Sequence, residues 1–184
     1  KTFSRLEITS KPETATSQPG TLTGYHLPVP LMVSGFHGST LSRIQNIMEK
    51  KGIPVLNAGS SSGNKAAAKS LGRPLQPGDA MGVALATGDL EAYAIGTVTY
   101  VDNQRLLGFG HPLFWYGNVN LPITEAWIST VMKGAVGLLP PYKIGYIGKT
   151  VGTRTEDRAT AVGGVLGEKP QTIPMTISTK DINR

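Results

Sequence analysis

One stretch of the chain, residues 96–113, constrains the possible fold more than any other. Its first part, residues 97–101, consists of Thr, Val and Tyr, which suit the pleated surface of a β-sheet. The pair Asp102-Asn103 follows, and both residue types form tight turns and tolerate positive φ. Residues 105–109 can then return as a second strand. The stretch therefore predicts a β-hairpin, which commits this region to an antiparallel sheet.

The rest of the chain has the composition of a protein with many short strands. Its 184 residues include 23 glycines and 13 prolines, which interrupt it too often for long helices. Hydrophobic residues make up 39% and charged residues 16%, so the chain can bury a core. We expect a mainly β fold of about eight to ten strands, an antiparallel barrel or sandwich with two packed helices.

The first predicted helix is the clearer of the two. Ser39 or Thr40 can cap its beginning, and Gly52 follows Lys50-Lys51 as a stop signal. The apolar residues between these points recur at helical spacing and form one face that should pack on a sheet: they are Leu41, Ile44, Ile47 and Met48.

The second predicted helix covers residues 123–133. Pro122 suits the position that opens a helix, and Gly134 suits the position that ends one. The residues that could form its buried face are Ala126, Trp127, Val131 and Met132.

The remaining chain divides into a short N-terminal region and one large domain. Residues 1–26 are expected to hold a strand and a polar linker, residues 27–178 the β domain, and residues 179–184 a tail. Residues 58–72, rich in Gly, Ser, Ala and Lys, are expected to be a mobile loop. The other strands are predicted at residues 3–8, 27–36 (an edge strand, because of its prolines), 53–56, 80–86, 91–101, 142–147, 149–154, 159–166 and 172–178.

Charge and cysteine content exclude several kinds of protein. The net charge is +6, but Lys50-Lys51 is the only adjacent basic pair and no basic run is interleaved with aromatic residues, so we expect no nucleic-acid binding. The absence of cysteine excludes disulfides and thiolate metal sites. No apolar run has the length of a transmembrane segment. No phosphate-binding loop is present, and we expect no cofactor.

His111 is the strongest candidate for chemistry. It follows the return strand of the hairpin, between Gly110, which removes bulk, and Pro112, which ends the ladder. An imidazole presented at a strand end can act as a general base. The alternative is a hydrogen-bonded structural histidine at a turn. His26 and His37, the other two histidines, are not at a metal-ligand spacing relative to it, so we expect no metal site.

A nucleophile within this chain has weak candidates. Ser34 and Ser39 lie next to glycines, but neither follows the strand–turn–helix pattern of a nucleophile elbow. Ser39 also suits a helix cap. Asp102 could orient His111 or simply form the turn. The pair Asp157-Arg158 is expected in a turn. The two residues could form an ion pair there or support the site around His111.

Several blocks of the chain together resemble the SpoIVB peptidase family of serine peptidases. The similarity extends from about Pro28 to Thr176, and its tandem Gly-Thr-Val-Thr-Tyr and Phe-Gly-His-Pro blocks are fairly specific. The matching residues are Pro77-Gly78-Asp79, Gly88-Asp89, residues 96–102, residues 109–112, Leu121-Pro122, Lys143, Gly152-Thr153, Asp157-Arg158 and residues 163–167. Pro30-Leu31 and Ser34-Gly35-Phe36 are similar to the larger bacterial envelope members.

The resemblance implies a chymotrypsin-like arrangement of β-barrels in which His111 is the general base. The Gly-Met-Ser-Gly-Ser-Pro block that carries the family's nucleophile is absent from this sequence, as is the preceding acid. The resemblance to the envelope members implies that both lie upstream of Lys1, so that this chain is the histidine-bearing part of a split site and is inactive alone. It further implies a protein or peptide substrate, autoprocessing or envelope signalling, and an exported, periplasmic or envelope location.

Two other functions remain open from the sequence. The chain could be a non-catalytic β module or pseudopeptidase that binds a peptide or a protein partner beside Phe114-Trp115-Tyr116. It could also be a self-contained hydrolase that uses Ser34 or Ser39.

Overall fold

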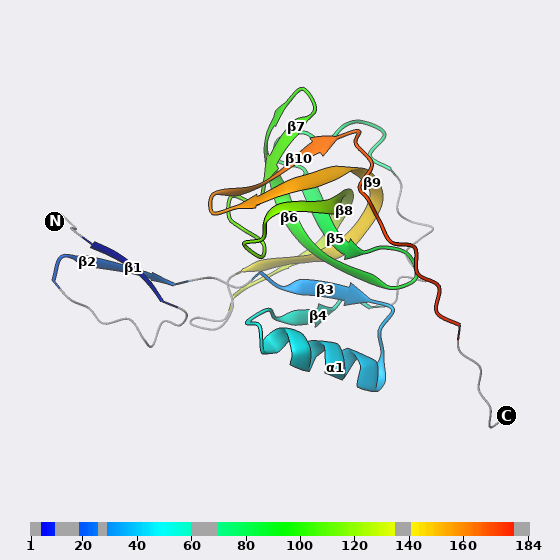
Figure 1. Cartoon of the computed structure of the whole chain (residues 1–184), viewed down its shortest axis with the longest axis horizontal. Helices are drawn as coiled ribbons and strands as arrows, with labels where there is room; N and C mark the ends of the chain where they lie inside the picture. Colours follow the sequence, from blue (N-terminus) through cyan, green and yellow to red (C-terminus); the bar gives the residue numbers. More distant parts are fainter. Residues whose placement is uncertain (1–4, 10–18, 26–28, 60–69, 135–140, 179–184) are drawn as a thin grey trace.

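The structure is a computed structural model that describes residues 5–9, 19–25, 29–59, 70–134 and 141–178. It is mainly β, as the sequence predicts, with an eight-stranded sheet, one helix and a separate two-stranded parallel pair (Figure 1). The elements are β1 (Arg5–Thr9), β2 (Thr21–Tyr25), β3 (Leu31–Ser34), α1 (Gly38–Glu49), β4 (Val55–Asn57), β5 (Ala80–Ala86), β6 (Glu91–Asp102), β7 (Arg105–Gly108), β8 (Gly117–Met132), β9 (Tyr142–Arg158) and β10 (Ala161–Leu166).

The large sheet closes partly into a ring. Its order is β4-β3-β6-β5-β8-β9-β10-β7, and β6 also pairs with β7, so that β5 to β10 return to their starting point. All six pairings within this ring are antiparallel. These pairings confirm the sequence prediction of an antiparallel, barrel-like sheet. Closure of the ring pairs strand edges that would otherwise be exposed.

The predicted hairpin is β6 and β7. Asp102 pairs with Arg105, so the two-residue turn consists of Asn103 and Gln104, one position later than the sequence predicts. Asn103 adopts φ +52°, which asparagine tolerates better than most residues. The N-terminal half of β6 pairs with β5, whereas its C-terminal half pairs with β7. The long strand β6 thereby closes the ring, because it pairs with both β5 and β7.

The first predicted helix is confirmed as α1. It connects β3 to the parallel strand β4, and Figure 1 shows it lying against these two strands outside the ring. Leu41, Ile44 and Met48 of its apolar face pack on buried residues of the strands, as expected, whereas Ile47 is 49% exposed and lies outside this cluster. The predicted cap is wrong: the helix begins one residue before Ser39, with His37 at the N-cap position and no side-chain capping bond.

Apolar side chains fill three contiguous clusters. Residues of one cluster lie inside the ring, and include Met81, Val83, Val98 and Ile123. The alternate residues of the same strands, such as Ala84 and Tyr93, form a second cluster on the other face together with Ala126 and Ile147 of β8 and β9. Because strand side chains alternate between faces, the strands β5 and β6 separate these two clusters. The third cluster lies under α1.

The second predicted helix is wrong, because residues 117–132 form the long strand β8. This strand pairs with β9 along most of its length and with β5 at its centre. Residues 122–126 are all buried. Five consecutive buried residues indicate a strand that is packed on both faces, whereas a surface helix would bury only one face. The spacing of Trp127, Val131 and Met132 suits a helix, but Val131 and Met132 are exposed in the strand.

Three strand predictions also need correction. The segment predicted as an edge strand at residues 27–36 contains β3, which lies between β4 and β6, although residues 27–28 are outside the described residues. Residues 142–147 and 149–154 belong to one continuous strand, β9. Residues 172–178 form no strand in the described chain, since no other segment pairs with them.

The described part of the predicted loop, residues 58–59 and 70–72, has no helix or strand, and residues 60–69 lie outside the description. The division into residues 1–26 and 27–178 stays a prediction, as does the tail at 179–184, which the structure does not describe. Among the described residues, no helix is both long enough and apolar enough to cross a membrane.

Candidate functional site

His111 lies on a sharply turning segment that follows β7. Phe109 and Gly110 both adopt positive φ, +69° and +71°, and so reverse the chain at the end of the strand. Two backbone hydrogen bonds hold the reversal: the Phe109 N–H donates to the Thr97 carbonyl and the Gly110 N–H to the Gly108 carbonyl, both at 2.9 Å. The His111 side chain is presented to solvent, while Pro112 after it is buried. The predicted presentation of an imidazole at a strand end is therefore what the backbone produces.

The hydrogen bonding of His111 selects one form of its neutral ring. Nδ1 lies 2.8 Å from the carbonyl oxygen of Pro112. A carbonyl oxygen can only accept a hydrogen bond, so this contact assigns the ring proton to Nδ1. The lone pair of the neutral imidazole is then on Nε2, which has no hydrogen-bond partner in the described chain. This is the tautomer in which a histidine accepts a proton at Nε2.

The ring of Phe109 supports His111 from the side. The two rings meet edge to face, with 5.6 Å between their centroids. Phe109 in turn lies on the backbone of Gly96 in β6, where an added Cβ would come within 2.4 Å of its ring. Phe109 also packs against the core inside the ring of strands. Because Gly96 has no side chain, the Phe109 ring can lie against β6 and contact His111 from there.

Asp157, near the end of β9, holds the chain just after His111. Its buried carboxylate accepts three backbone hydrogen bonds: Leu113 N–H at 2.8 Å, Phe114 N–H at 2.8 Å and Tyr116 N–H at 3.2 Å. Trp115, between these donors, adopts φ +63°, so the segment wraps around the carboxylate. We call residues 109–116 the histidine loop. One acidic side chain fixes the second half of this loop to the sheet.

Arg154 accompanies Asp157 inside the protein, and their side chains are completely buried with 2.6 Å between Nη2 and Oδ2. Burial by itself raises the pKa of the Asp157 carboxyl, but the three backbone donors and Arg154 outweigh this and hold the pKa below its usual value. Burial lowers the pKa of Arg154, and the charge of Asp157 opposes that change. The pair is therefore ionised and anchors the histidine loop.

Asp157 and Arg158 were expected in a turn, and the structure places them instead at the end of β9. Their roles differ. Asp157 contacts the histidine loop, as a supporting residue would. Arg158 is exposed and donates to Asn118 at 2.7 Å and to Glu156 at 3.2 Å. Arg154, the actual ionic partner of Asp157, was missed by the sequence reasoning, because an arginine inside a strand carries no local signal of burial.

The two serine candidates are not brought to His111 by any hydrogen bond. Ser34 is 3% exposed and donates through Oγ to the Gly59 carbonyl at 2.9 Å. Ser39 lies in the first turn of α1 and faces solvent. Asp102 lies at the hairpin turn, the opposite end of β7 from the histidine loop, where Asn103 donates to it at 3.1 Å. Asp102 is therefore a turn residue and does not orient His111.

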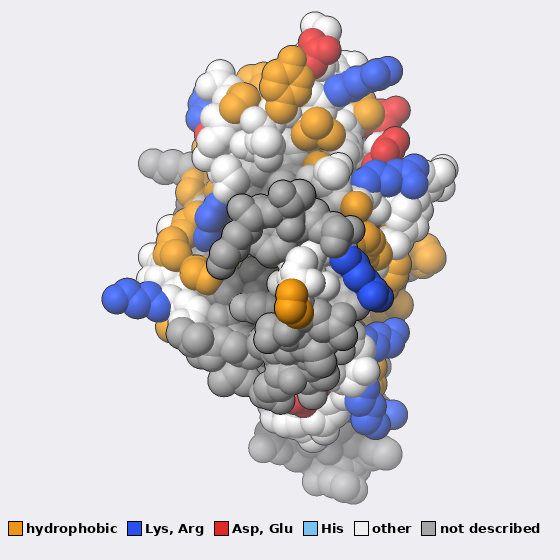
Figure 2. All heavy atoms as spheres, turned by 90° about the vertical axis from the view of Figure 1, so that its left-hand side faces the viewer, with side chains coloured by type: hydrophobic (Ala, Val, Ile, Leu, Met, Phe, Trp, Pro, Cys, Tyr) orange, Lys and Arg blue, Asp and Glu red, His pale blue; other side chains and the backbone are white. Residues whose placement is uncertain are grey.

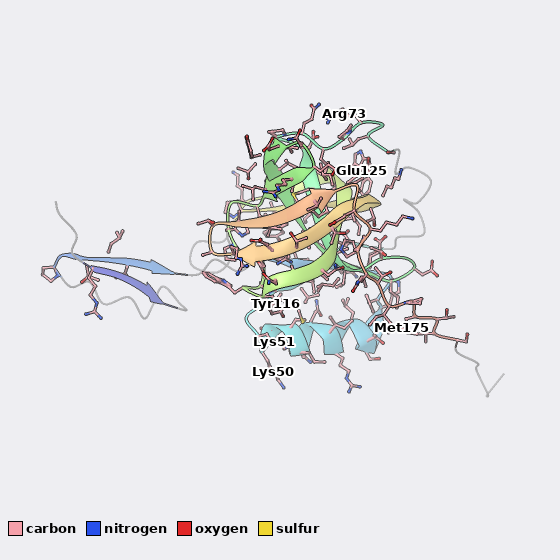
Figure 3. All side chains as sticks on the ribbon, turned by 45° about the horizontal axis from the view of Figure 1, so that its top comes forward. Lys50, Lys51, Arg73, Tyr116, Glu125 and Met175 are labelled. Atoms are coloured by element: carbon pink, nitrogen blue, oxygen red, sulfur yellow. The ribbon has the colours of Figure 1, made fainter. Side chains whose placement is uncertain are left out.

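The aromatic residues of the histidine loop form an exposed surface next to His111. Trp115 and Tyr116 each present more than half of their surface to solvent. Phe114 is partly buried, and its ring lies 5.4 Å from that of Tyr116. Figure 3 shows Tyr116 on the side of the sheet that faces α1. Such a surface, whose backbone is hydrogen-bonded to Asp157, offers apolar contact area to a ligand.

Two further sets of polar contacts involve Arg73, Asp79 and Glu125. The sequence did not indicate these contacts. Arg73 and Glu125 lie toward the other end of the molecule from Tyr116 (Figure 3). The buried Glu125 accepts hydrogen bonds from Ser70 Oγ at 2.9 Å and from the Leu71 N–H at 3.0 Å. Arg73 binds Asp79 with two bonds of 2.6 and 2.8 Å. These contacts fix the segment before β5, as Asp157 fixes the histidine loop.

Potential metal ligands do not cluster in the described chain. Its His, Asp and Glu residues form no cluster of three that could hold a metal ion. His37 is at the start of α1, and His26 lies outside the described residues. On the face in Figure 2, most of the visible Lys and Arg side chains lie along the right-hand edge, and a few lie on the left. A surface pocket of about 480 Å³ lies at the hairpin turn, away from His111, and is lined by Asp102, Asn103, Gln104, Arg105 and Val165.

Comparisons of the chain with protein-family models, with curated proteins and with solved structures found no match.

Proposed function

We propose that this chain is the histidine-bearing part of a serine endopeptidase of the SpoIVB type, in which His111 is the general base. The observation that carries the proposal is the hydrogen bond from His111 Nδ1 to the Pro112 carbonyl, which leaves the Nε2 lone pair free at the protein surface. The resemblance of the Phe-Gly-His-Pro block to that family motivates the choice of reaction. The partly closed antiparallel ring is compatible with the chymotrypsin-like fold that the resemblance implies.

In the proposed reaction, His111 Nε2 removes the proton of a serine hydroxyl as that oxygen attacks the peptide carbonyl. The resulting imidazolium then donates the proton to the leaving amine. The Pro112 carbonyl stabilises the imidazolium through Nδ1–H. The acid that the family carries upstream would add a negative charge to the dipole of this neutral carbonyl. Asp157 and Arg154 are positioning residues, since they contact the loop backbone and not the imidazole.

The nucleophile comes, in this proposal, from a segment carrying the Gly-Met-Ser-Gly-Ser-Pro block and lying outside the printed chain. Ser34 is buried and engaged with Gly59, so its oxygen is a poor candidate for attack on a substrate. Ser39 is exposed on α1 and has no hydrogen bond to an imidazole. The chain alone is then inactive. The substrate is a protein or peptide, and an envelope or exported location follows from the resemblance alone.

A fluorophosphonate that reacts with activated serines tests the proposal. It is applied to the printed chain and to the full product of its gene, each with the His111→Ala variant. The expected result is labelling of the full product only, with the rate reduced about 10⁴-fold or more by His111→Ala. Labelling of the printed chain, lost in Ser34→Ala or Ser39→Ala, would instead identify a self-contained hydrolase.

A second function, peptide binding without catalysis, is favoured by the exposed Trp115 and Tyr116. An extended peptide that packs on these rings would need no nucleophile. In that case Trp115→Ala abolishes binding of a peptide library, while His111→Ala does not. Trp127→Ala is the matched control, because Trp127 is stacked on Tyr146 across β8 and β9 and is not part of the histidine loop.

A further inference from the structure

The segment after β10 has the most exposed of the large apolar side chains in the described chain. Ile173, Met175 and Ile177 are 91%, 78% and 66% exposed, and every second residue is one of them. Figure 3 shows Met175 on the tail at the edge of the molecule, and Figure 1 shows the tail leaving the sheet. Single exposed apolar residues are common on protein surfaces, but a regular alternation of highly exposed ones is not.

The start of this tail is fixed, whereas its apolar part has no partner in the described chain. Thr153 Oγ1 donates to the Glu168 carbonyl at 3.1 Å, and the Gln171 N–H donates to Asn120 Oδ1 at 2.7 Å. Beyond Gln171, residues 172–178 have no hydrogen bond to any described residue and belong to no strand. The molecule therefore presents an unpaired stretch of backbone from a defined point on β8 and β9.

The sequence of the tail is nevertheless that of a strand. Thr172, Thr176 and Ser178 alternate with the three apolar residues, and Ile and Thr favour strands. Only Pro174 would normally argue against a strand, because it has no N–H to donate. The position of Pro174 restricts the possible pairing, because the backbone nitrogen and carbonyl of residue 174 must face away from the partner strand. Residues 173, 175 and 177 must then be those that exchange hydrogen bonds.

We infer that residues 172–178 pair in antiparallel register with the same segment of a second copy of this chain. A two-fold axis at Met175 places Met175 opposite Met175 of the other copy and Ile173 opposite Ile177. Pro174 then lies opposite Thr176, at positions that make no ladder bonds, and Thr172 lies opposite Ser178. All six apolar side chains fall on one face of the two-stranded ribbon, where cross-strand pairs stabilise each other.

The self-complementary pattern is the reason for choosing a second copy as the partner. The register centred on Met175 pairs every apolar residue with an apolar one, whereas a shift of the axis by one residue leaves an isoleucine without an apolar partner. Residues 172–178 carry no charged side chain, so two copies do not repel each other there. Free edges also remain elsewhere in the described chain, at β4 and on the separate β1–β2 pair, and that of β4 is only three residues long, Val55–Asn57.

Cysteine cross-linking tests both the pairing and its register, since the chain contains no cysteine. Hydrogen-bonded antiparallel partners have Cα atoms about 5.5 Å apart, a distance that a disulfide can bridge. Under mild oxidation, Met175→Cys is expected to form a covalent dimer. Ile173→Cys alone is expected to remain uncross-linked, whereas a mixture of Ile173→Cys and Ile177→Cys chains gives the mixed dimer. Cross-linking of Ile173→Cys alone with none for Met175→Cys would overturn the register.

The mass in solution tests the association itself. The wild-type chain is expected to shift from 19.5 kDa toward twice that mass as its concentration rises. Ile173→Asn/Ile177→Asn should abolish this shift, and the matched control Thr172→Asn/Thr176→Asn, on the opposite face, should retain it. Circular dichroism establishes that all variants fold. A wild-type chain that is monomeric at every concentration overturns the inference, as does a dimer that persists in Ile173→Asn/Ile177→Asn.

Discussion

Arg154 and Asp157, three residues apart on β9, form an ion pair with 2.6 Å between Nη2 and Oδ2 and with neither side chain reaching solvent. The pair connects the sheet to the histidine loop, because Asp157 also accepts the backbone N–H groups of Leu113, Phe114 and Tyr116. A buried charge pair contributes little by itself to stability, but the loss of one member leaves the other charge uncompensated. The following predictions begin from this relationship.

Asp157→Asn is expected to lower the free energy of unfolding by about 3 to 5 kcal/mol. The guanidinium of Arg154 would lose the one carboxylate that pairs with it among the described residues, and its Nη1 already has no hydrogen-bond acceptor there. Urea unfolding followed by circular dichroism measures the change. The control is Arg158→Gln, which breaks an exposed ion pair with Glu156 and should cost about 1 kcal/mol or less. Equal effects of the two substitutions would contradict the anchoring role of Asp157.

Stability is expected to fall on acidification because of Asp157. Its pKa in the folded protein lies below that of the unfolded chain, which is about 3.9. The unfolded state therefore takes up the proton first as the pH falls, so the stabilisation is complete above a pH of about 5 and disappears through the folded-state pKa. Urea unfolding at a series of pH values measures this slope.

The control for the pH dependence is Asp79→Asn, which removes another carboxyl whose pKa is lowered, in that case by Arg73. Asp79 is the more exposed of the two, so most of the slope should remain in this variant. A free energy of unfolding that is constant or rises between pH 5 and pH 3 would rule out the proposed ionisation of Asp157.

Gly164→Ala is expected to destabilise the sheet by about 1 to 3 kcal/mol. A Cβ at Gly164 would lie 2.4 Å from Ile123 Cδ1 and 2.6 Å from the Thr153 carbonyl oxygen, where β10 crosses β9 at a register shift. The neighbouring Gly163 is the matched control, because its Cβ would meet Glu156 at an ordinary 3.4 Å. Thermal unfolding of both variants checks the difference, and similar melting temperatures would be inconsistent with the packing at β10.

Gly96→Ala is expected to disturb His111 without contacting it. The added methyl group would displace the Phe109 ring, which contacts the imidazole edge to face. The NMR resonances of the His111 ring should shift, and fluorophosphonate labelling of the full gene product should slow. Phe109→Leu, which removes the aromatic edge but keeps apolar volume, should shift the same resonances. Unchanged His111 resonances in both variants would exclude this route of support.

The elements that depend on nearby residues could be predicted from the sequence. The β6–β7 hairpin and α1 each form from contacts between residues close in the chain, and their turn and stop residues mark them. The exposure of His111 at a strand end could also be predicted, because Gly110 and Pro112 flank it. Whether His111 is a catalytic base stays a prediction.

Other features depended on segments that are distant in the chain. Residues 123–133 have the spacing of a helix, and only pairing with β9, and with β5 at residues 123–125, makes residues 123–132 part of a strand. Residues 172–178 have the pattern of a strand and lack a partner within the described chain. Strand formation requires hydrogen bonds from another segment, so local propensity alone does not decide it.

The sequence by itself determined the β-rich composition, the hairpin, α1 and the exposed histidine that follows β7. The tertiary structure alone decided the closure of the ring, the burial of Arg154 beside Asp157 and the attachment of Asp157 to the histidine loop. The physical reason is the range of the interactions. Turns and helices satisfy their hydrogen bonds locally, whereas a buried charge is stable only where the fold supplies both its counter-charge and its hydrogen-bond donors.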